Sequence, residues 1–329
     1  MEKKDLLRVK NLTIGFEIEN SSFEAVDSIS FNINQGESIA LVGESGCGKS
    51  ISAMAIINLL PTPPAVIKNG EIIFENKNIF SLKEDELRKI RGRDIGIIFQ
   101  EPMTSLNPTK TIGNQIGEVF KIHYPQLTKK DIKEKTISLL KKVGIPLAEE
   151  RIDSYPHEFS GGMRQRVMIA MAIACNPKLL IADEPTTALD VTIQAQILDL
   201  IKNIQKEYGM SLLLITHNMG IVVNICDKII IMYAGRIIES GTIINIFSNP
   251  LHPYTKGLLD SIPLLNKEKE QLYSIPGIVP HPKDFIKGCR FRDRCSKRFE
   301  KCNTDEKPLL FKIKDNHSVA CWLYEKNNK

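Results

Sequence analysis

The chain has 329 residues, of which 42% are apolar and 25% charged, and its formal net charge at pH 7 is +5. This length allows one large or two medium domains, and the mild positive charge permits contact with phosphates without requiring nucleic acid. The polar N-terminus excludes a signal peptide, and the longest apolar runs are shorter than the roughly 18 residues that span a bilayer. We therefore expect a cytoplasmic protein.

Five apolar runs predict short buried strands in a mostly parallel α/β sheet, because strands covered on both faces read as continuous apolar segments. They are residues 38–43, 94–100, 179–184, 211–217 and 228–235. The N-terminal segments alternate polar and apolar residues, which predicts an antiparallel β-subdomain. Residues 101–176 lack strand signals and carry helical spacing, so we expect a helical insertion. Recurring prolines after residue 249 place a boundary near 250, between a domain of residues 1–250 and a C-terminal extension of 251–329.

The sequence GESGCGKS at 43–50 fits the phosphate-binding P-loop pattern, with a predicted strand before it and a predicted helix after it. Its backbone N–H groups can surround a phosphate, Lys49 can reach the β- and γ-phosphates, and the Ser50 hydroxyl can ligate Mg²⁺. The alternative is a glycine-rich turn with a chance lysine. The predicted ATP-binding residues of the loop are Gly43, Glu44, Ser45, Gly46, Cys47, Gly48, Lys49, Ser50 and Ile51.

Four more polar residues end predicted strands, where ligands of open α/β sheets bind. Asp183 is predicted to hold Mg²⁺ and Glu184 to polarise the attacking water, although two carboxylates there also suit a solvated turn. His217 is a candidate γ-phosphate contact, with a structural histidine as the alternative. Gln100 is a candidate Mg²⁺ ligand and catalytic sensor that links the nucleotide to the helical insertion, or else a loop residue.

The sequence FSGGMRQR at 159–166 precedes a helical run. Ser160, Gly161 and Gly162 would form a second anion site at that helix N-terminus, although serine and glycine also suit an ordinary helix start. A second phosphate-binding turn makes sense if two subunits each contribute half of an ATP site.

This ordered set of motifs, with TALD at 187–190, resembles the ATP-binding cassette (ABC) family of P-loop NTPases over about residues 5–250. Phe159 departs from the family's usual leucine. The resemblance implies that Phe16 stacks on adenine, unless it is a core strand residue. It also implies that two nucleotide-binding domains meet head to tail, with Asp190 coupling the two sites.

The sequences at 99–108, 249–259 and 274–280 are similar to those of ATPase subunits of bacterial dipeptide and oligopeptide importers. This resemblance implies a second ATPase subunit in a heterodimer, two membrane permeases, an extracellular solute-binding protein and a place on the cytoplasmic face of the membrane. The alternatives are a nickel importer and a soluble cassette ATPase acting on nucleic acid. A chain that is chiefly a metal or redox sensor is disfavoured by the complete nucleotide motifs.

Four cysteines lie in the C-terminal extension, at Cys289, Cys295, Cys302 and Cys321. Six basic residues between the first and third of them should lower the thiol pKa values and favour the ligating thiolates. Similar tails of peptide-importer ATPases are associated with a 4Fe-4S cluster. We therefore expect a 4Fe-4S cluster on these four cysteines, with Zn²⁺ or reduced, unliganded thiols as the alternatives.

Overall fold

The computed structural model describes residues 4–18, 21–101, 105–187, 189–262 and 274–328. Residues 102–104 and 188, which belong to two of the motifs quoted above, lie outside the described part. Two compact units are distinguished. The first contains residues 34–37 and 82–214, and the second contains residues 5–33, 38–81 and 215–329.

The second unit begins with an antiparallel sheet, as the alternating N-terminal pattern predicts. Its strand order is β2-β1-β4-β5, and Val9 of β1 lies opposite Ile72 of β4. Leu7, Val9 and Leu12 of β1 are buried. The elements of this part are β1 (Asp5–Ile18), β2 (Ser21–Asn34), β4 (Ala65–Phe74), β5 (Lys77–Asn78) and η1 (Ile79–Ser81).

A second group of strands in this unit has the order β11-β12-β10-β9-β3. β3 and β9 are parallel, whereas β10, β12 and β11 are added antiparallel. All five residues of β3 are buried. The elements are β3 (Ser38–Val42), α1 (Lys49–Ile56), α9 (Met219–Val222), β9 (Lys228–Tyr233), β10 (Arg236–Thr242), α10 (Ile243–Ser248) and α11 (Pro253–Asp260).

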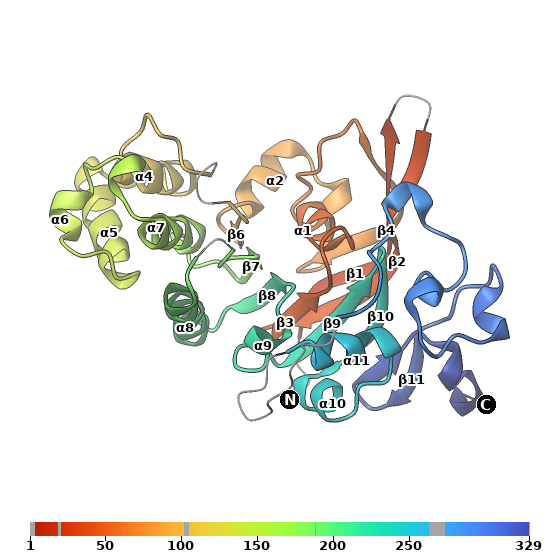
Figure 1. Cartoon of the computed structure of the whole chain (residues 1–329). Coiled ribbons are helices and arrows are strands. Elements are labelled where there is room, and N and C mark those ends of the chain that lie inside the picture. Colours follow the sequence, from red (N-terminus) through yellow and green to blue (C-terminus); the bar gives the residue numbers. More distant parts are fainter. Residues whose placement is uncertain (1–3, 19–20, 102–104, 188, 263–273, 329) are drawn as a thin grey trace. The chain divides into compact units, whose positions relative to one another are not determined.

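The C-terminal extension, blue in Figure 1, is built onto this sheet. Its strand β12 pairs with β10, where Glu239 lies opposite Val319. No strand is predicted here from the sequence, because the segment is short and rich in proline and charged residues. The elements after α11 are η3 (Pro282–Asp284), η4 (Arg292–Arg294), η5 (Glu300–Asn303), β11 (Phe311–Lys314), β12 (His317–Val319) and η6 (Trp322–Asn328).

The first unit contains the predicted helices and the parallel strands β8, β7 and β6, in that order. α4, α5, α6 and α7 form the yellow-green cluster of Figure 1, where α4 contacts both α5 and α7. The elements are α2 (Glu84–Ile90), β6 (Ile95–Ile98), α4 (Ile112–His123), α5 (Lys129–Lys142), α6 (Ala148–Arg151), η2 (Pro156–Glu158), α7 (Gly161–Ile173), β7 (Leu179–Asp183), α8 (Val191–Tyr208) and β8 (Ser211–Thr216), whose last two residues belong to the second unit.

The fold prediction is confirmed in its main points. The five predicted strands correspond to β3, β6, β7, β8 and β9, each within two residues at either end. The helical insertion is present as α4 to α7. Long helices show the expected signals: α8 is capped by Asp190 at its start, ends at Gly209 in the left-handed conformation and buries Ile197, Ile201 and Ile204 on one face.

Candidate ATP-binding and hydrolysis site

The P-loop joins the buried strand β3 to α1, as its motif requires. Gly43 lies so close to the neighbouring strand that a Cβ there would be 2.3 Å from the carbonyl oxygen of Met232. Gly48 has φ +97°, a conformation that residues with a Cβ rarely adopt. Two of the loop's glycines are therefore required by the backbone path itself, which agrees with a loop built to wrap a phosphate.

Lys49 is nearly fully buried at 5% exposure, and its ammonium group is turned back over the loop. Its Nζ donates to the carbonyl oxygens of Gly43, at 2.8 Å, and Glu44, at 3.0 Å. The two bonds hold the positive charge inside the concave side of the loop. Cys47 is also buried, and burial raises the pKa of its thiol, so this residue is a neutral part of the packing. Ser50 and Ile51 follow in the first turn of α1.

In the first unit, Gln100 and Glu184 follow the adjacent parallel strands β6 and β7, as predicted. The Gln100 Nε2 donates to Glu184 Oε2 at 3.2 Å, and the Thr187 hydroxyl donates to the same oxygen at 3.0 Å. Glu184 has φ +44°, an unusual conformation for a residue with a side chain. Such local strain is typical of functional positions. Asp183, the last residue of β7, is 7% exposed. Thr187 is the first residue of the TALD motif, but its hydrogen bond to Glu184 was not predicted from the sequence.

The predicted second phosphate turn is the start of α7. The Ser160 hydroxyl accepts a hydrogen bond from the N–H of Met163 at 3.3 Å, so Ser160 caps the helix. A Cβ at Gly162 would be 2.8 Å from the Ile193 side chain, whereas Gly161 has more room. Asp190 caps α8 in the same way, accepting from the N–H of Ile193 at 2.9 Å. Both turns lie in the first unit, and each leaves helix N–H groups available at its start.

Two further predicted residues lie in the second unit. Phe16 of β1 is half-buried and stacks on Phe23 of β2, with ring centroids 5.8 Å apart. His217 is exposed, directly after the end of β8. Ser50 of the second unit carries a hydroxyl oxygen, whereas Gln100 and Asp183 of the first unit carry an amide and a carboxylate oxygen. Each of these is a ligand type that suits Mg²⁺.

The chain matches the "ABC transporter" family model over residues 26–187 and the model "Oligopeptide/dipeptide transporter, C-terminal region" over residues 238–302. It is 50% identical to the oligopeptide transport ATP-binding protein OppD of Bacillus subtilis over 319 residues, which cover 97% of this chain and 88% of that protein. It is 47% identical to the dipeptide transport ATP-binding protein DppD of the same organism, over 99% of this chain and 96% of DppD. The chain belongs to the ABC transporter ATP-binding proteins.

Solved structures agree with this assignment to the ABC family. The dimeric, post-hydrolysis structure of the ATP-binding cassette MJ0796 bound to ADP and Pi has a TM-score of 0.65 and 28% identity, covering 72% of this chain and 99% of that one. CbiO1 of Clostridium perfringens, part of the ABC transporter complex cbiONQ, has a TM-score of 0.63 and 30% identity, covering 75% and 92%. The chain is therefore an ATPase of the ABC type, whose ATP hydrolysis is coupled to transport.

The prediction of a 4Fe-4S cluster is wrong. Within the described residues no group of three or more His, Cys, Asp or Glu side chains is placed to hold a metal ion, so Zn²⁺ is unsupported as well. The relatives that match along the chain are named as ATP-binding proteins, and their names mention no iron–sulfur centre. Cys289, Cys295, Cys302 and Cys321 are free thiols.

These cysteines are not ligating thiolates because burial disfavours the charged form of a thiol. Burial raises the pKa of Cys289 to about 11 and that of Cys321 to about 12, and the pKa of Cys295 is raised too, so these thiols are neutral. Cys302 packs with Phe311 and Trp322 in a small apolar core, against which Cys289 also lies. Neighbouring arginines bind elsewhere, Arg290 to Asp27 and Arg294 to Glu44. The charge that was expected to stabilise thiolates is thus paired with carboxylates.

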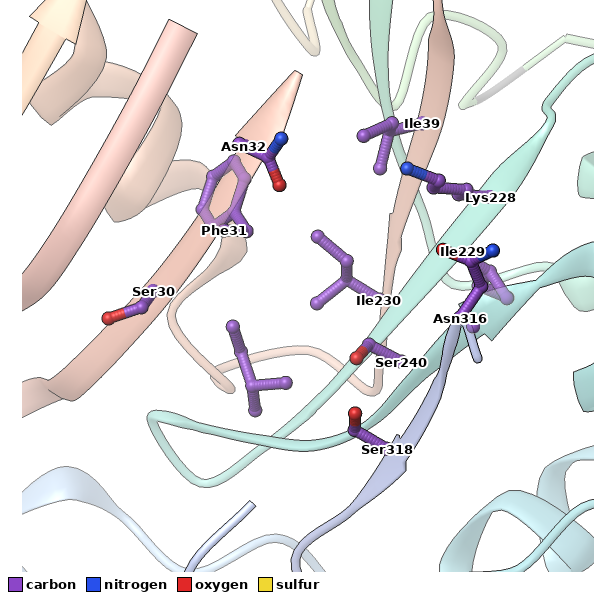
Figure 2. Close-up of a pocket in the computed structure, with 12 residues that line it drawn as sticks. Ser30, Phe31, Asn32, Ile39, Lys228, Ile229, Ile230, Ser240, Asn316 and Ser318 are labelled. Atoms are coloured by element: carbon purple, nitrogen blue, oxygen red, sulfur yellow. The ribbon is translucent and has the colours of Figure 1, made fainter. Parts of the chain in front are cut away.

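A cavity of about 180 Å³ lies among β2, β9, β10 and β12 (Figure 2). Ser240 and Ser318 point their hydroxyls toward it, and Ile230 lies beside them. None of its lining residues belongs to the predicted ATP site, so it plays no part in the site described above.

No helix within the described part of the chain is both long and apolar enough to cross a membrane.

Proposed function

We propose that this chain is the ATP-hydrolysing subunit that powers the import of oligopeptides or dipeptides through an ABC transporter. The observation that carries the proposal is relatedness along almost the whole chain to peptide transport ATP-binding proteins, including the match to their C-terminal region. The relatives reported above are named for peptides, which favours peptides over nickel as cargo. The particular peptide would be selected by the permeases and the binding protein.

In the proposed ATP site, the P-loop wraps the phosphates of ATP and Lys49 binds the β- and γ-phosphates. The glycine positions that exclude a Cβ and the lysine held over the loop support this assignment. Residues 43–51 form the loop and first helical turn, and Phe16 stacks on the adenine. Mg²⁺, held by Ser50, Asp183 and Gln100, would neutralise charge on the phosphates.

Glu184 acts as the general base for the attacking water, and His217 contacts the γ-phosphate. The bonds from Gln100 and Thr187 to one Glu184 oxygen support this role, since they fix the carboxylate at the end of β7. Gln100 also begins the connection to the helical insertion, so the state of the nucleotide can be passed to that segment.

Two such ATPase subunits are proposed to close head to tail, with the Ser160, Gly161 and Gly162 turn of each completing the other's site. The start of α7 supports this, because Ser160 is a neutral cap and the N-terminus of a helix favours anions. Asp190 would couple the two sites. The second subunit is proposed to be a related ATPase, giving a heterodimer.

The remaining partners are two membrane permeases, which would hold this chain at the cytoplasmic face of the membrane, and an extracellular solute-binding protein that acts through them. A groove of about 360 Å³ beside α4 and α5, lined by Gly117, Lys121 and Ile132 among others, supports docking of a permease segment on the helical insertion. We also propose that the nucleotide-binding domain ends near residue 250, where the C-terminal extension begins.

The test uses the chain reconstituted with its permeases. Lys49→Ala should abolish ATP turnover, and Glu184→Gln should bind ATP with unchanged affinity while hydrolysis falls by about a thousandfold. Peptide uptake into vesicles should stop in both. Hydrolysis at the wild-type rate in Glu184→Gln would remove the assigned base, and co-purification with nucleic acid in place of permeases would support the soluble alternative.

A further inference from the structure

Glu44, the second residue of the P-loop, is held on three sides within the second unit. Its backbone N–H donates to the Tyr254 hydroxyl at 3.0 Å. Its two carboxylate oxygens accept from Arg294, Nη1 at 2.7 Å and Nη2 at 3.0 Å. Its carbonyl oxygen accepts from Lys49 Nζ at 3.0 Å. Tyr254 and Arg294 both belong to the segment after residue 250, so the C-terminal extension touches the phosphate-binding loop directly.

The Arg294 contact differs from an ordinary surface ion pair. The arginine side chain is 6% exposed, its Nε donates to the Pro276 carbonyl oxygen at 2.8 Å, and its guanidinium lies 5.7 Å from the Tyr233 ring centroid. A two-bond guanidinium–carboxylate pair with a fixed arginine is stronger and more specific in geometry than an exposed pair.

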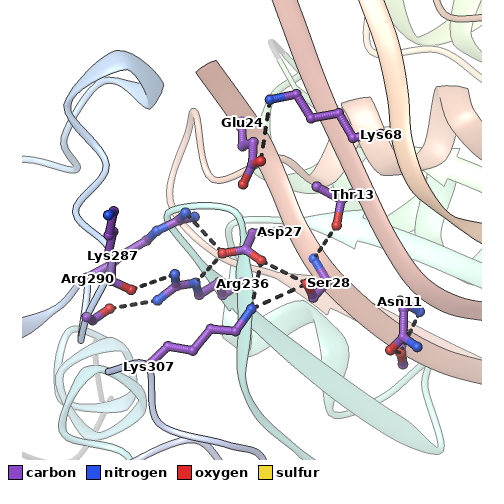
Figure 3. A network of polar contacts seen from close by, with 12 residues as sticks. Asn11, Thr13, Glu24, Asp27, Ser28, Lys68, Arg236, Lys287, Arg290 and Lys307 are labelled. Atoms are coloured by element: carbon purple, nitrogen blue, oxygen red, sulfur yellow. Dashed lines mark hydrogen bonds and ion pairs between the residues drawn. The ribbon is translucent and has the colours of Figure 1, made fainter. Parts of the chain in front are cut away.

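Asp27 of β2 anchors the extension on both sides of Arg294. It accepts from Arg290 at 3.2 Å and from Lys307 at 3.0 Å, and also from Arg236 of β10 at 2.8 Å. Figure 3 shows these three cations converging on the Asp27 carboxylate. Because Arg290 and Lys307 both bind Asp27, the segment that carries Arg294 is held in place on both sides of the residue that contacts Glu44.

The extension also reaches the proposed adenine end of the site. Phe23, which stacks on Phe16, lies 6.0 Å from the His281 ring and 5.9 Å from Lys283 Nζ. Residues of the extension therefore contact the neighbours of both the phosphate-binding loop and the adenine-binding ring.

We infer that Arg294 is a positioning residue of the ATP site, which neutralises Glu44 and fixes the P-loop from the C-terminal extension. The inference rests on the proposed binding of ATP by this loop. Without Arg294, the Glu44 carboxylate would be an unpaired negative charge one residue from Gly43, in the loop that must bind phosphates. It would repel the nucleotide and compete for Lys49, whose Nζ is already bonded to the Glu44 carbonyl oxygen.

The first experiment measures the affinities of the purified chain for Mg-ATP and for adenosine at low salt. The second measures steady-state ATP hydrolysis by the complex reconstituted with its permeases. Arg294→Gln should weaken ATP binding about tenfold and raise KM similarly, with kcat changed less than threefold. Adenosine binding should not change, because it has no phosphate. The double variant Glu44→Gln/Arg294→Gln should recover most of the ATP affinity, because the repelling carboxylate is gone.

Arg298→Ala is the matched control, since the Arg298 side chain is 43% exposed and donates to Asp293 and Asn303, both within the extension. Circular dichroism checks folding, and Arg294→Lys, which keeps the charge but loses the fork, replaces Arg294→Gln if that variant is unstable. Wild-type ATP affinity in Arg294→Gln, or equal losses for ATP and adenosine, would overturn the inference. A wild-type chain that does not bind ATP would instead overturn the proposed function.

Discussion

Gln100 and Glu184, which are 84 positions apart in the sequence, share a hydrogen bond of 3.2 Å at the carboxyl ends of two adjacent parallel strands. The bond places an amide donor on the carboxylate that we propose as the general base. It also joins that carboxylate to Gln100, the residue through which we propose that the nucleotide state reaches the helical insertion.

Gln100→Ala should lower kcat for ATP hydrolysis about tenfold while changing ATP affinity less than threefold, because a fixed donor to the base is lost. Steady-state kinetics and equilibrium binding measure the two effects. Gln126→Ala, in an exposed loop of the same unit, is the control and should leave both unchanged. Equal kcat values for wild type and Gln100→Ala would refute the role of this contact.

Gly43→Ala should destabilise the protein by about 3 kcal/mol or abolish ATP binding, because the new Cβ meets a backbone oxygen that cannot move aside. Thermal unfolding with and without Mg-ATP tests this. Gly117→Ala is the comparison: its Cβ would approach only the Ile132 side chain, at 3.2 Å, and alanine favours the helix α4. Similar losses in the two variants would argue against a special backbone path at Gly43.

Asp27→Asn should lower the free energy of unfolding by about 3 kcal/mol at pH 7, because three cations lose their shared carboxylate. Although burial alone would raise the pKa of Asp27, Arg236, Lys307 and Arg290 hold it far below its usual 3.8. A lowered pKa stabilises the fold above pH 3.8, and this contribution is lost as the pH falls further.

The difference in the free energy of unfolding between wild type and Asp27→Asn, measured with urea, should therefore become steadily smaller below about pH 4. Asp315→Asn, at an exposed carboxylate, is the control and should change nothing measurable. A difference that stays constant between pH 7 and pH 3 would show that Asp27 acts by packing and not by charge.

His252 gives the free energy of unfolding a second pH dependence, which arises from burial and not from charge pairing. Burial lowers the pKa of His252 to about 4 from 6.5, and its Nδ1 accepts the N–H of Tyr254 at 3.0 Å, so the ring is neutral. Because the unfolded chain takes up this proton more readily, stability is unaffected above pH 6.5 and falls by about 3 kcal/mol between pH 6.5 and 4.

His252→Asn, whose side-chain oxygen can also cap α11, should flatten the unfolding free energy over that range, measured at half-unit pH steps. If the free energy of unfolding of His252→Asn falls with pH as steeply as that of the wild type, other groups cause the pH dependence.

Most residues of the proposed ATP site were predicted from local sequence. The P-loop pattern, the carboxylates at 183–184 and the serine-glycine turn can each be recognised in a few consecutive residues, since strand ends and helix starts fix where such side chains point. Ser160 and Asp190 also turned out to be helix caps, a local role that the same residue types indicate. Arg294 and Tyr254 carried no such signal, because their partner Glu44 lies 250 and 210 positions away.

The cysteine segment shows the limit most clearly. Its sequence determined that thiols and cations are close along the chain, and from this we predicted thiolates. In the tertiary structure Cys302 is buried, Cys289 is partly buried against the same small core, Arg290 binds Asp27 and Arg294 binds Glu44, which favours neutral thiols instead.

The sequence by itself thus determined the P-loop, the strand-end carboxylates and the family, because these depend on residues that are neighbours in the chain. Only the tertiary structure decided which charges are neutralised and which groups the extension touches. Burial and pairing depend on what lies nearby in space, and for Glu44 that neighbour comes from the other end of the chain.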